Sequence, residues 1–348
     1  MAEGSEPQQP TTIDLDSIAE EQLLDLRICD LPIRIEGTWL QERVAQLYQE
    51  LKAKNIPFEP HCYLADEWLT PEGEPVIGIP FYLAHPRLVA LEKKMMLEAE
   101  GAEPDGCMRV LRHESGHALS YAYDLHRKRS WQRVFGHPSA EYGDTYRFRP
   151  YSRSFVRHLD HHYAQYHPDE DFVETFAVWL TPGLDWRAQY EGWKALDKLL
   201  FVDRLMQGIA GKPPLRNNGK QYWKAGRIRR TLRRHYQQRR HAEAENYPDF
   251  HDANLLSMFR EGQASGETRP AVARLIQAHR KQLLASVAGW TGEGRYMVNE
   301  VIKAIHQRAK ALRLVIDGPE TAALLQLSTY VTTLLMNYRH TNRLRGKL

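Results

Sequence analysis

The stretch VLRHESGHAL, residues 110–119, decides how the first half of this chain folds. It contains the pattern H-E-x-x-H, whose histidines are His113 and His117. Positions four apart on an α-helix lie on one face, so both imidazoles can reach a single Zn²⁺ while Glu114 points toward the open coordination position of the metal. The apolar flanks predict a helix with one buried side, where charged groups need partners. The alternative is a core in which two histidines and a glutamate only hydrogen-bond.

Length and cysteine content indicate a reduced globular protein. A chain of 348 residues is long enough for about two domains and a substantial core. Its three cysteines, Cys29, Cys62 and Cys107, form no C-x-x-C motif, which predicts reduced and mostly buried thiols. Residues 1–12 lack the basic and apolar regions of a signal peptide, and no run approaches the roughly 18 apolar residues that a membrane span needs. We therefore expect a soluble, cytoplasmic protein without a membrane partner.

Charge is divided unequally along the chain. Residues 216–348 hold 24 Lys and Arg against 10 Asp and Glu, whereas residues 1–215 hold 23 against 34. The two parts therefore carry about +14 and −11. The change coincides with a segment rich in Pro, Asn and Gly at 211–219, which would stop a helix. These observations predict a disordered start at 1–19, a first domain at 20–215 and a basic, all-helical domain at 216–348.

Apolar spacing predicts many helices and a small sheet, so the expected fold class is α+β and predominantly helical. Thr38 can cap a helix to about Lys54, and strands are expected at 58–64 and 75–84. Pro80 cannot donate to a ladder, so the second strand should be an edge strand. An irregular connection is expected at 129–154. Further helices are expected at 86–100, 106–125, 168–180, 219–246, 269–290, 294–313 and 318–342.

Two histidines need a further protein ligand, because catalytic zinc normally binds three side chains and a water. The extension H-E-x-x-H-x-x-G-x-x-H is absent, since Ser120 and Tyr123 replace its glycine and last histidine. Glu170 and Glu174 lie four apart on one expected helix, so one could bind the metal while the other accepts the second ring N–H of a ligating histidine. The other candidates by residue type are His158, Asp160, His161, His162 and His167.

The two motifs HESGH at 113–117 and EDFVETF at 170–176 resemble the gluzincin clan of zincin metallopeptidases. They are most similar to the cytosolic zinc-binding metallopeptidases and the lethal-factor-like group, whose pattern is H-E-x-G-H, then Tyr, then E-x-F-x-E. The resemblance covers roughly residues 75–182. It implies a zincin-like catalytic domain with a small sheet and an active-site helix. It also implies that Glu170 completes the metal site, that Glu174 supports the ligands and that Tyr163 stabilises the transition state.

Together these residues and the resemblance predict a zinc-dependent metallopeptidase that hydrolyses a peptide or protein substrate. His113, His117 and Glu170 would hold one catalytic Zn²⁺, and Glu114 would act as general base toward the attacking water. Tyr163 would hydrogen-bond the oxyanion, with Tyr166 and Tyr123 as competitors. The alternatives are a catalytically idle zincin-like module that binds a peptide or protein, and a nucleic-acid-associated protein with structural zinc.

The densest basic run extends from Lys224 to Arg240 and is interleaved with aromatic residues. Such a run can bind nucleic acid, because arginine neutralises phosphate and aromatic rings stack on bases. Docking against the acidic first domain explains the opposite charges more simply, so we expect docking and no nucleic-acid partner. Binding of an acidic partner by the basic helices is a third alternative.

Overall fold

The computed structural model describes residues 13–140, 149, 151–159, 162–243, 251–262 and 269–341. Residues 1–12 of the predicted disordered start lie outside this set. The described chain divides into two compact units, and the predicted domain limits stay a prediction. The first unit is formed by residues up to 92, 100–125 and 208–237, and the second by 93–99, 126–207 and the residues from 238 onward.

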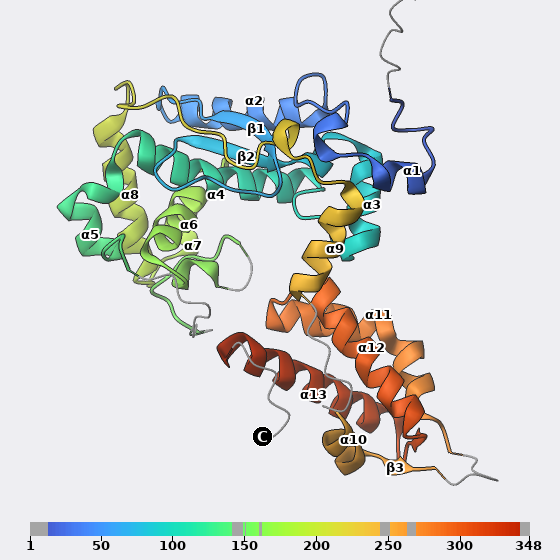
Figure 1. The fold of residues 1–348 in the computed structure, drawn as a ribbon. Helices are drawn as coiled ribbons and strands as arrows, with labels where there is room; N and C mark the ends of the chain where they lie inside the picture. Colours follow the sequence, from blue (N-terminus) through green and yellow to red (C-terminus); the bar gives the residue numbers. More distant parts are fainter. Residues whose placement is uncertain are drawn as a thin grey trace, which may run out of the picture. The chain divides into compact units, whose positions relative to one another are not determined.

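The first unit combines a small sheet with helices (Figure 1). Strands β1 (His61–Ala65) and β2 (Val76–Pro80) pair in parallel, with Tyr63 opposite Gly78. Thr38 accepts a hydrogen bond from the Leu40 amide and caps α2, as predicted. The helical elements of this unit are α1 (Glu20–Asp25), η1 (Ile28–Asp30), α2 (Trp39–Ala53), η2 (Phe81–Ala84), α4 (Pro104–Ala122) and η5 (Ala225–Arg227); α3 (Pro86–Met96) begins in it.

Strand β2 is an edge strand, as predicted, because its sheet in the described part of the chain has two strands, although a single bridge to Leu69 covers its centre. Leu69 and Gly78 exchange two backbone hydrogen bonds of 3.3 and 2.8 Å on the side away from β1. This approach requires glycine, because a Cβ at position 78 would lie 2.4 Å from a methyl carbon of Leu69 and 2.8 Å from the Cβ of Ala65. Pro80 is tolerated because it ends the strand.

Helix α4 carries the H-E-x-x-H motif and is the most deeply buried helix of the first unit. Pro104 occupies its first turn, where a missing amide hydrogen costs nothing. Its buried residues form an almost continuous run from Val110 to Ser120, and the helix packs against α2. Each fully buried leucine-sized side chain contributes about 1.5–3 kcal/mol relative to an exposed one, so this packing holds the motif on a rigid element.

The second unit contains a helical part with an aromatic core. The ring of Phe172 on α6 lies 5.7 Å from that of Trp131 and 5.4 Å from that of Phe135, both on α5. These contacts attach α5 to α6. The elements of this part are η3 (Leu125–Arg127), which begins at the limit between the units, α5 (Arg129–Phe135), η4 (Tyr163–Gln165), α6 (Pro168–Leu180), α7 (Trp186–Gln189) and α8 (Ala195–Ile209).

The second unit also contains three long packed helices (Figure 1). They are α11 (Val272–Thr291), α12 (Arg295–Ala311) and α13 (Glu320–Thr341). One continuous apolar cluster joins them, and α10 (Asp252–Met258) and the short strands β3 (Arg260–Glu261) and β4 (Leu314–Val315) adjoin it. Among the described residues, no helix is both long enough and apolar enough to cross a membrane.

The strand expected at 75–84 ends at Pro80, because Phe81–Ala84 form the 3-10 helix η2. Two further predicted segments differ from the structure. The helix expected at 219–246 is wrong in its first part, because α9 begins only at Leu232 (Leu232–Glu243). The carbonyl of Trp223 accepts the amide of Asp66, and Lys224 forms a bridge with Ala65, so a turn and the short helix η5 lie beside the end of β1 in place of the expected helix. The irregular connection expected at 129–154 contains α5 at its start. In both places contacts distant in sequence override the local pattern.

Candidate metal centre

Three side chains of the sequence-predicted site come together as a group that can hold a metal ion. The ligand atoms of His113, His117 and Glu170 all lie within 4.8 Å of one another. His113 and Glu170 are buried, and His117 is partly buried. Among the residues that the structure describes, this is the one group of three or more His, Cys, Asp or Glu side chains with that property.

The two histidines of the group share one face of α4. Their ring centroids lie 5.2 Å apart, as expected for residues one helical turn apart. Glu114 lies between them in the chain and is also buried, at 8% exposure. The backbone carbonyl of Glu114 accepts a hydrogen bond of 3.1 Å from the hydroxyl of Thr70. That contact ties the loop after β1 to the middle of the motif.

A buried ion pair precedes the motif by one residue. Arg112 donates from Nε and Nη2 to the two carboxylate oxygens of Glu50, each at 2.7 Å. The pair joins α4 to α2 with only 10% and 5% of its side chains exposed. Paired, two-pronged geometry of this kind fixes direction as well as distance. It therefore limits rotation of α4 about its axis, which determines where the adjacent histidine points.

The first turn of α6 is organised by His167, which sequence reasoning listed only as a candidate ligand. Its Nδ1 accepts the amide of Asp169 at 3.1 Å, so Nε2 carries the hydrogen and donates to the carbonyl of Ala140 at 2.8 Å. His167 is thus the N-cap of the helix that presents Glu170 and Glu174. The acidic first turn and Pro168 made the start of this helix predictable.

Glu174 lies one turn after Glu170 and is completely buried. Its Oε2 accepts a hydrogen bond of 2.8 Å from the backbone amide of Leu159. The glutamate therefore fastens the segment before η4 to α6. The neighbouring carboxyl of Asp171 is also buried, and burial raises its pKa to about 7 while the ammonium of Lys198, 2.6 Å away, opposes that shift.

The three candidate tyrosines differ in their surroundings. Tyr163 lies in η4, beside α6, with its ring stacked 5.9 Å from that of Tyr166. Tyr123 is buried, packs edge-on against Phe58 and donates its hydroxyl to the carbonyl of Lys212 at 2.9 Å. Tyr123 therefore has a packing role, which leaves Tyr163 and Tyr166 as the candidates for an oxyanion donor.

The remaining candidate ligands that lie among the described residues are not part of the group. His158 and His162 are described but do not join His113, His117 and Glu170. Asp160 and His161 lie outside the described residues. Sequence reasoning missed Tyr121, whose ring stacks on that of His117 at 6.4 Å. The four-residue spacing of these two residues on one helix was the available signal.

The donor set fits a first-row transition metal such as zinc better than it fits Mg²⁺ or Ca²⁺. Two imidazole nitrogens and one carboxylate oxygen are the three-ligand set of many catalytic zinc sites, whereas Mg²⁺ and Ca²⁺ prefer oxygen alone. Zinc bonds to these atoms measure about 2.0–2.2 Å, so small side-chain shifts would bring the three donors onto one ion. The residues present therefore fit the metal that the motif predicts.

Several arginines of the basic run have acidic partners in the first unit. Arg230 forms an ion pair with Asp66, and Arg233 contacts Asp25 at 2.8 Å and Glu21 at 2.9 Å. The partners belong to the acidic first 215 residues. Part of the positive charge is thus already neutralised within the chain.

Comparisons with known proteins add no further information. No family model matches the chain, no curated protein is similar to it, and no solved structure resembles it.

Proposed function

We propose that this protein is a zinc-dependent metallopeptidase whose metal ligands are His113, His117 and Glu170. The observation that carries the proposal is the group of His113, His117 and Glu170, together with the buried Glu114 that follows the first histidine in the sequence. When bound, Zn²⁺ would polarise the scissile carbonyl and lower the pKa of a water toward about 7.

Glu114 would move the proton in this reaction. Its carboxylate would take a proton from the attacking water and later return it to the leaving amine. The position fits this role because the glutamate that follows the first histidine of an H-E-x-x-H helix is the general base of that pattern. Thr70, which bonds the backbone at this residue, would help to keep the carboxylate in place.

Tyr163 or Tyr166 would donate a hydrogen bond to the developing oxyanion. Both lie on the segment that the Glu174 carboxylate fastens to α6 through Leu159. A donor held in this way gains its effect in the transition state, where the charge appears. Removal of one such donor typically costs about 100-fold or more in kcat.

Cleavage of a peptide library by wild type and by Glu114→Gln tests the proposal. We expect cleavage by wild type loaded with one zinc, and none by Glu114→Gln although its zinc content is unchanged. Tyr123→Phe serves as a control, because the hydroxyl of Tyr123 donates to the carbonyl of Lys212. This variant should keep a cleavage rate within a few-fold of wild type. If zinc-loaded wild type cuts no peptide in the library, the peptidase proposal gives way to an idle peptide-binding module.

The nucleic-acid alternative has a separate test. Because Arg230 and Arg233 already pair with acidic groups, binding of DNA or RNA should be weak. Affinity that falls steeply as salt rises would support that alternative, since each released counterion adds to the slope.

A further inference from the structure

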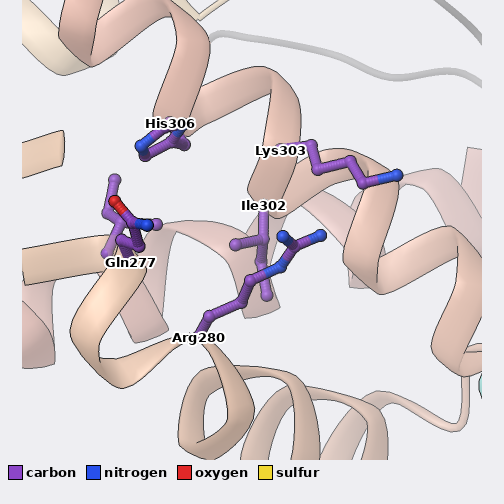
Figure 2. Close-up of a pocket in the computed structure, with 6 residues that line it drawn as sticks. Gln277, Arg280, Ile302, Lys303 and His306 are labelled. Carbon is purple, nitrogen blue, oxygen red and sulfur yellow. The ribbon is translucent and has the colours of Figure 1, made fainter. Parts of the chain in front are cut away.

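A small pocket lies between α11 and α12 in the second unit, far along the chain from the metal ligands. Figure 2 shows the residues that line it and labels five of them. Its apolar walls come from Ile276 and Ile302, which are 1% and 2% exposed. Its polar lining comes from Gln277, Arg280 and His306, together with Lys303. None of the six residues is acidic.

The guanidinium of Arg280 is held in one orientation. Its Nε and Nη2 both donate to Oδ1 of Asn299, at 3.0 and 2.5 Å. Asn299 is 6% exposed, and its amide nitrogen donates to Glu300. A charge fixed in this way loses little side-chain entropy when it binds a ligand, because the ordering has occurred on folding. Its Nη1 forms no hydrogen bond to any residue in the described part of the chain.

The other polar groups of the pocket fall into two kinds. The ammonium of Lys303 turns away from the pocket in Figure 2 and lies 2.5 Å from the carboxylate of Glu300. Gln277 and His306 lie on the opposite side of Ile302 from that ammonium. Within the described residues, neither the amide of Gln277 nor the ring of His306 has a hydrogen-bond partner. The pocket thus offers the guanidinium of Arg280, the amide of Gln277 and the imidazole of His306.

We infer that this pocket binds a carboxylate group attached to a short apolar chain. Arg280 would take the charge, since a guanidinium pairs with carboxylate in two-pronged geometry. Gln277 and His306 would hydrogen-bond the same oxygens, and the two isoleucines would contact the carbon chain. The volume of about 110 Å³ matches a group of a few heavy atoms. A free carboxylic acid and a glutamate side chain of a partner share this chemistry.

Titration of the full chain with butyrate, followed by NMR shifts of the α11 and α12 amides, tests the inference. We expect saturable binding that Arg280→Gln weakens by about tenfold or more, the loss typical of a charged hydrogen bond. Lys281→Gln is the matched control: it makes the same charge change at the adjacent exposed residue, which does not line the pocket, and should bind like wild type.

A second variant keeps the test decisive if Arg280→Gln does not fold. Gln277 is exposed, so Gln277→Glu should fold, and the added negative charge should abolish butyrate binding. Gln326→Glu on α13 is its control. Equal affinity of the pocket and control variants would overturn the inference, as would an absence of saturable shifts. An acidic peptide that binds at least tenfold more tightly than butyrate would identify a protein side chain as the ligand. The metal centre takes no part in this test.

Discussion

The guanidinium of Arg112 and the carboxylate of Glu50 form a closed, two-pronged ion pair with both hydrogen bonds at 2.7 Å. The two residues are 62 positions apart in sequence, and the pair is almost completely buried. Its position next to His113 links the packing of α4 to the orientation of a proposed metal ligand. Its removal should therefore affect both stability and metal binding.

Glu50→Ala should lower the free energy of unfolding by about 3–5 kcal/mol, because it leaves the Arg112 charge buried without its partner. Urea unfolding followed by circular dichroism measures this loss. Glu42→Ala on the same helix is the control, since Glu42 is 75% exposed in its pair with Arg43 and should change stability by less than about 1 kcal/mol. Equal losses in the two variants would remove the stabilising role assigned to the buried pair.

Glu174→Gln should weaken zinc affinity by about 10- to 100-fold, whereas Glu170→Ala should remove binding almost completely. The first change perturbs a group that supports the site and holds Leu159, and the second deletes a proposed metal bond. Competition with a chromophoric chelator measures both affinities. A larger loss in Glu174→Gln than in Glu170→Ala would reverse the two assignments.

The sequence predicted the two site helices closely because their signals are local. Helix α6 begins at Pro168 and ends at Leu180, as its proline, acidic first turn and following Pro182 indicate. Helix α4 was expected at 106–125 and spans Pro104–Ala122. The donor group followed from the residue types and the family resemblance, since a four-residue spacing identifies one helix face without tertiary information.

The features that sequence missed depend on residues distant in the chain. The Arg112 and Glu50 pair has no local pattern, and the loop residue Leu69 covers β2 only because the chain folds back on Gly78. The sequence near Trp223 predicts a helix, yet the carbonyl of Trp223 accepts a hydrogen bond from the amide of Asp66, directly after β1. Tertiary contacts of this kind are worth more than the propensity of a short segment.

Acid should destabilise the second unit through His251. Burial, aided by Arg308 and opposed by Asp252, lowers the pKa of this imidazole from 6.5 to about 4. The unfolded chain therefore binds a proton between pH 6.5 and 4 that the folded chain does not, and stability falls as pH falls through this window. The full loss is at most about 3 kcal/mol.

Hydrogen exchange of the α13 amides at several pH values measures this effect, because His251 bonds Tyr330 on that helix at 2.9 Å. His251→Gln should show lower protection near neutral pH and a flatter dependence between pH 6.5 and 4. The same slope in wild type and in the variant would assign the acid sensitivity to other groups.

The three thiols should differ in reactivity. Burial raises the pKa of Cys62 and of Cys107 to about 12, so at pH 8 only about one molecule in 10⁴ carries either thiolate. Cys29 and Cys62 are both partly exposed and Cys107 is buried, so the expectation of mostly buried thiols is wrong for two of the three. In the native protein a thiol-reactive dye should label Cys29 first, and Cys29→Ser should remove the fast phase. A fast phase that survives in Cys29→Ser would mean that one of the other thiols is accessible.

Zinc content per chain tests the central claim most directly. Metal analysis after dialysis should find one zinc in wild type and one in Glu114→Gln, since that residue is assigned to proton transfer and not to coordination. His117→Ala and Glu170→Ala should each contain close to none, while retaining the circular dichroism spectrum of wild type. One zinc retained in both of these variants would contradict the metal centre formed by His113, His117 and Glu170.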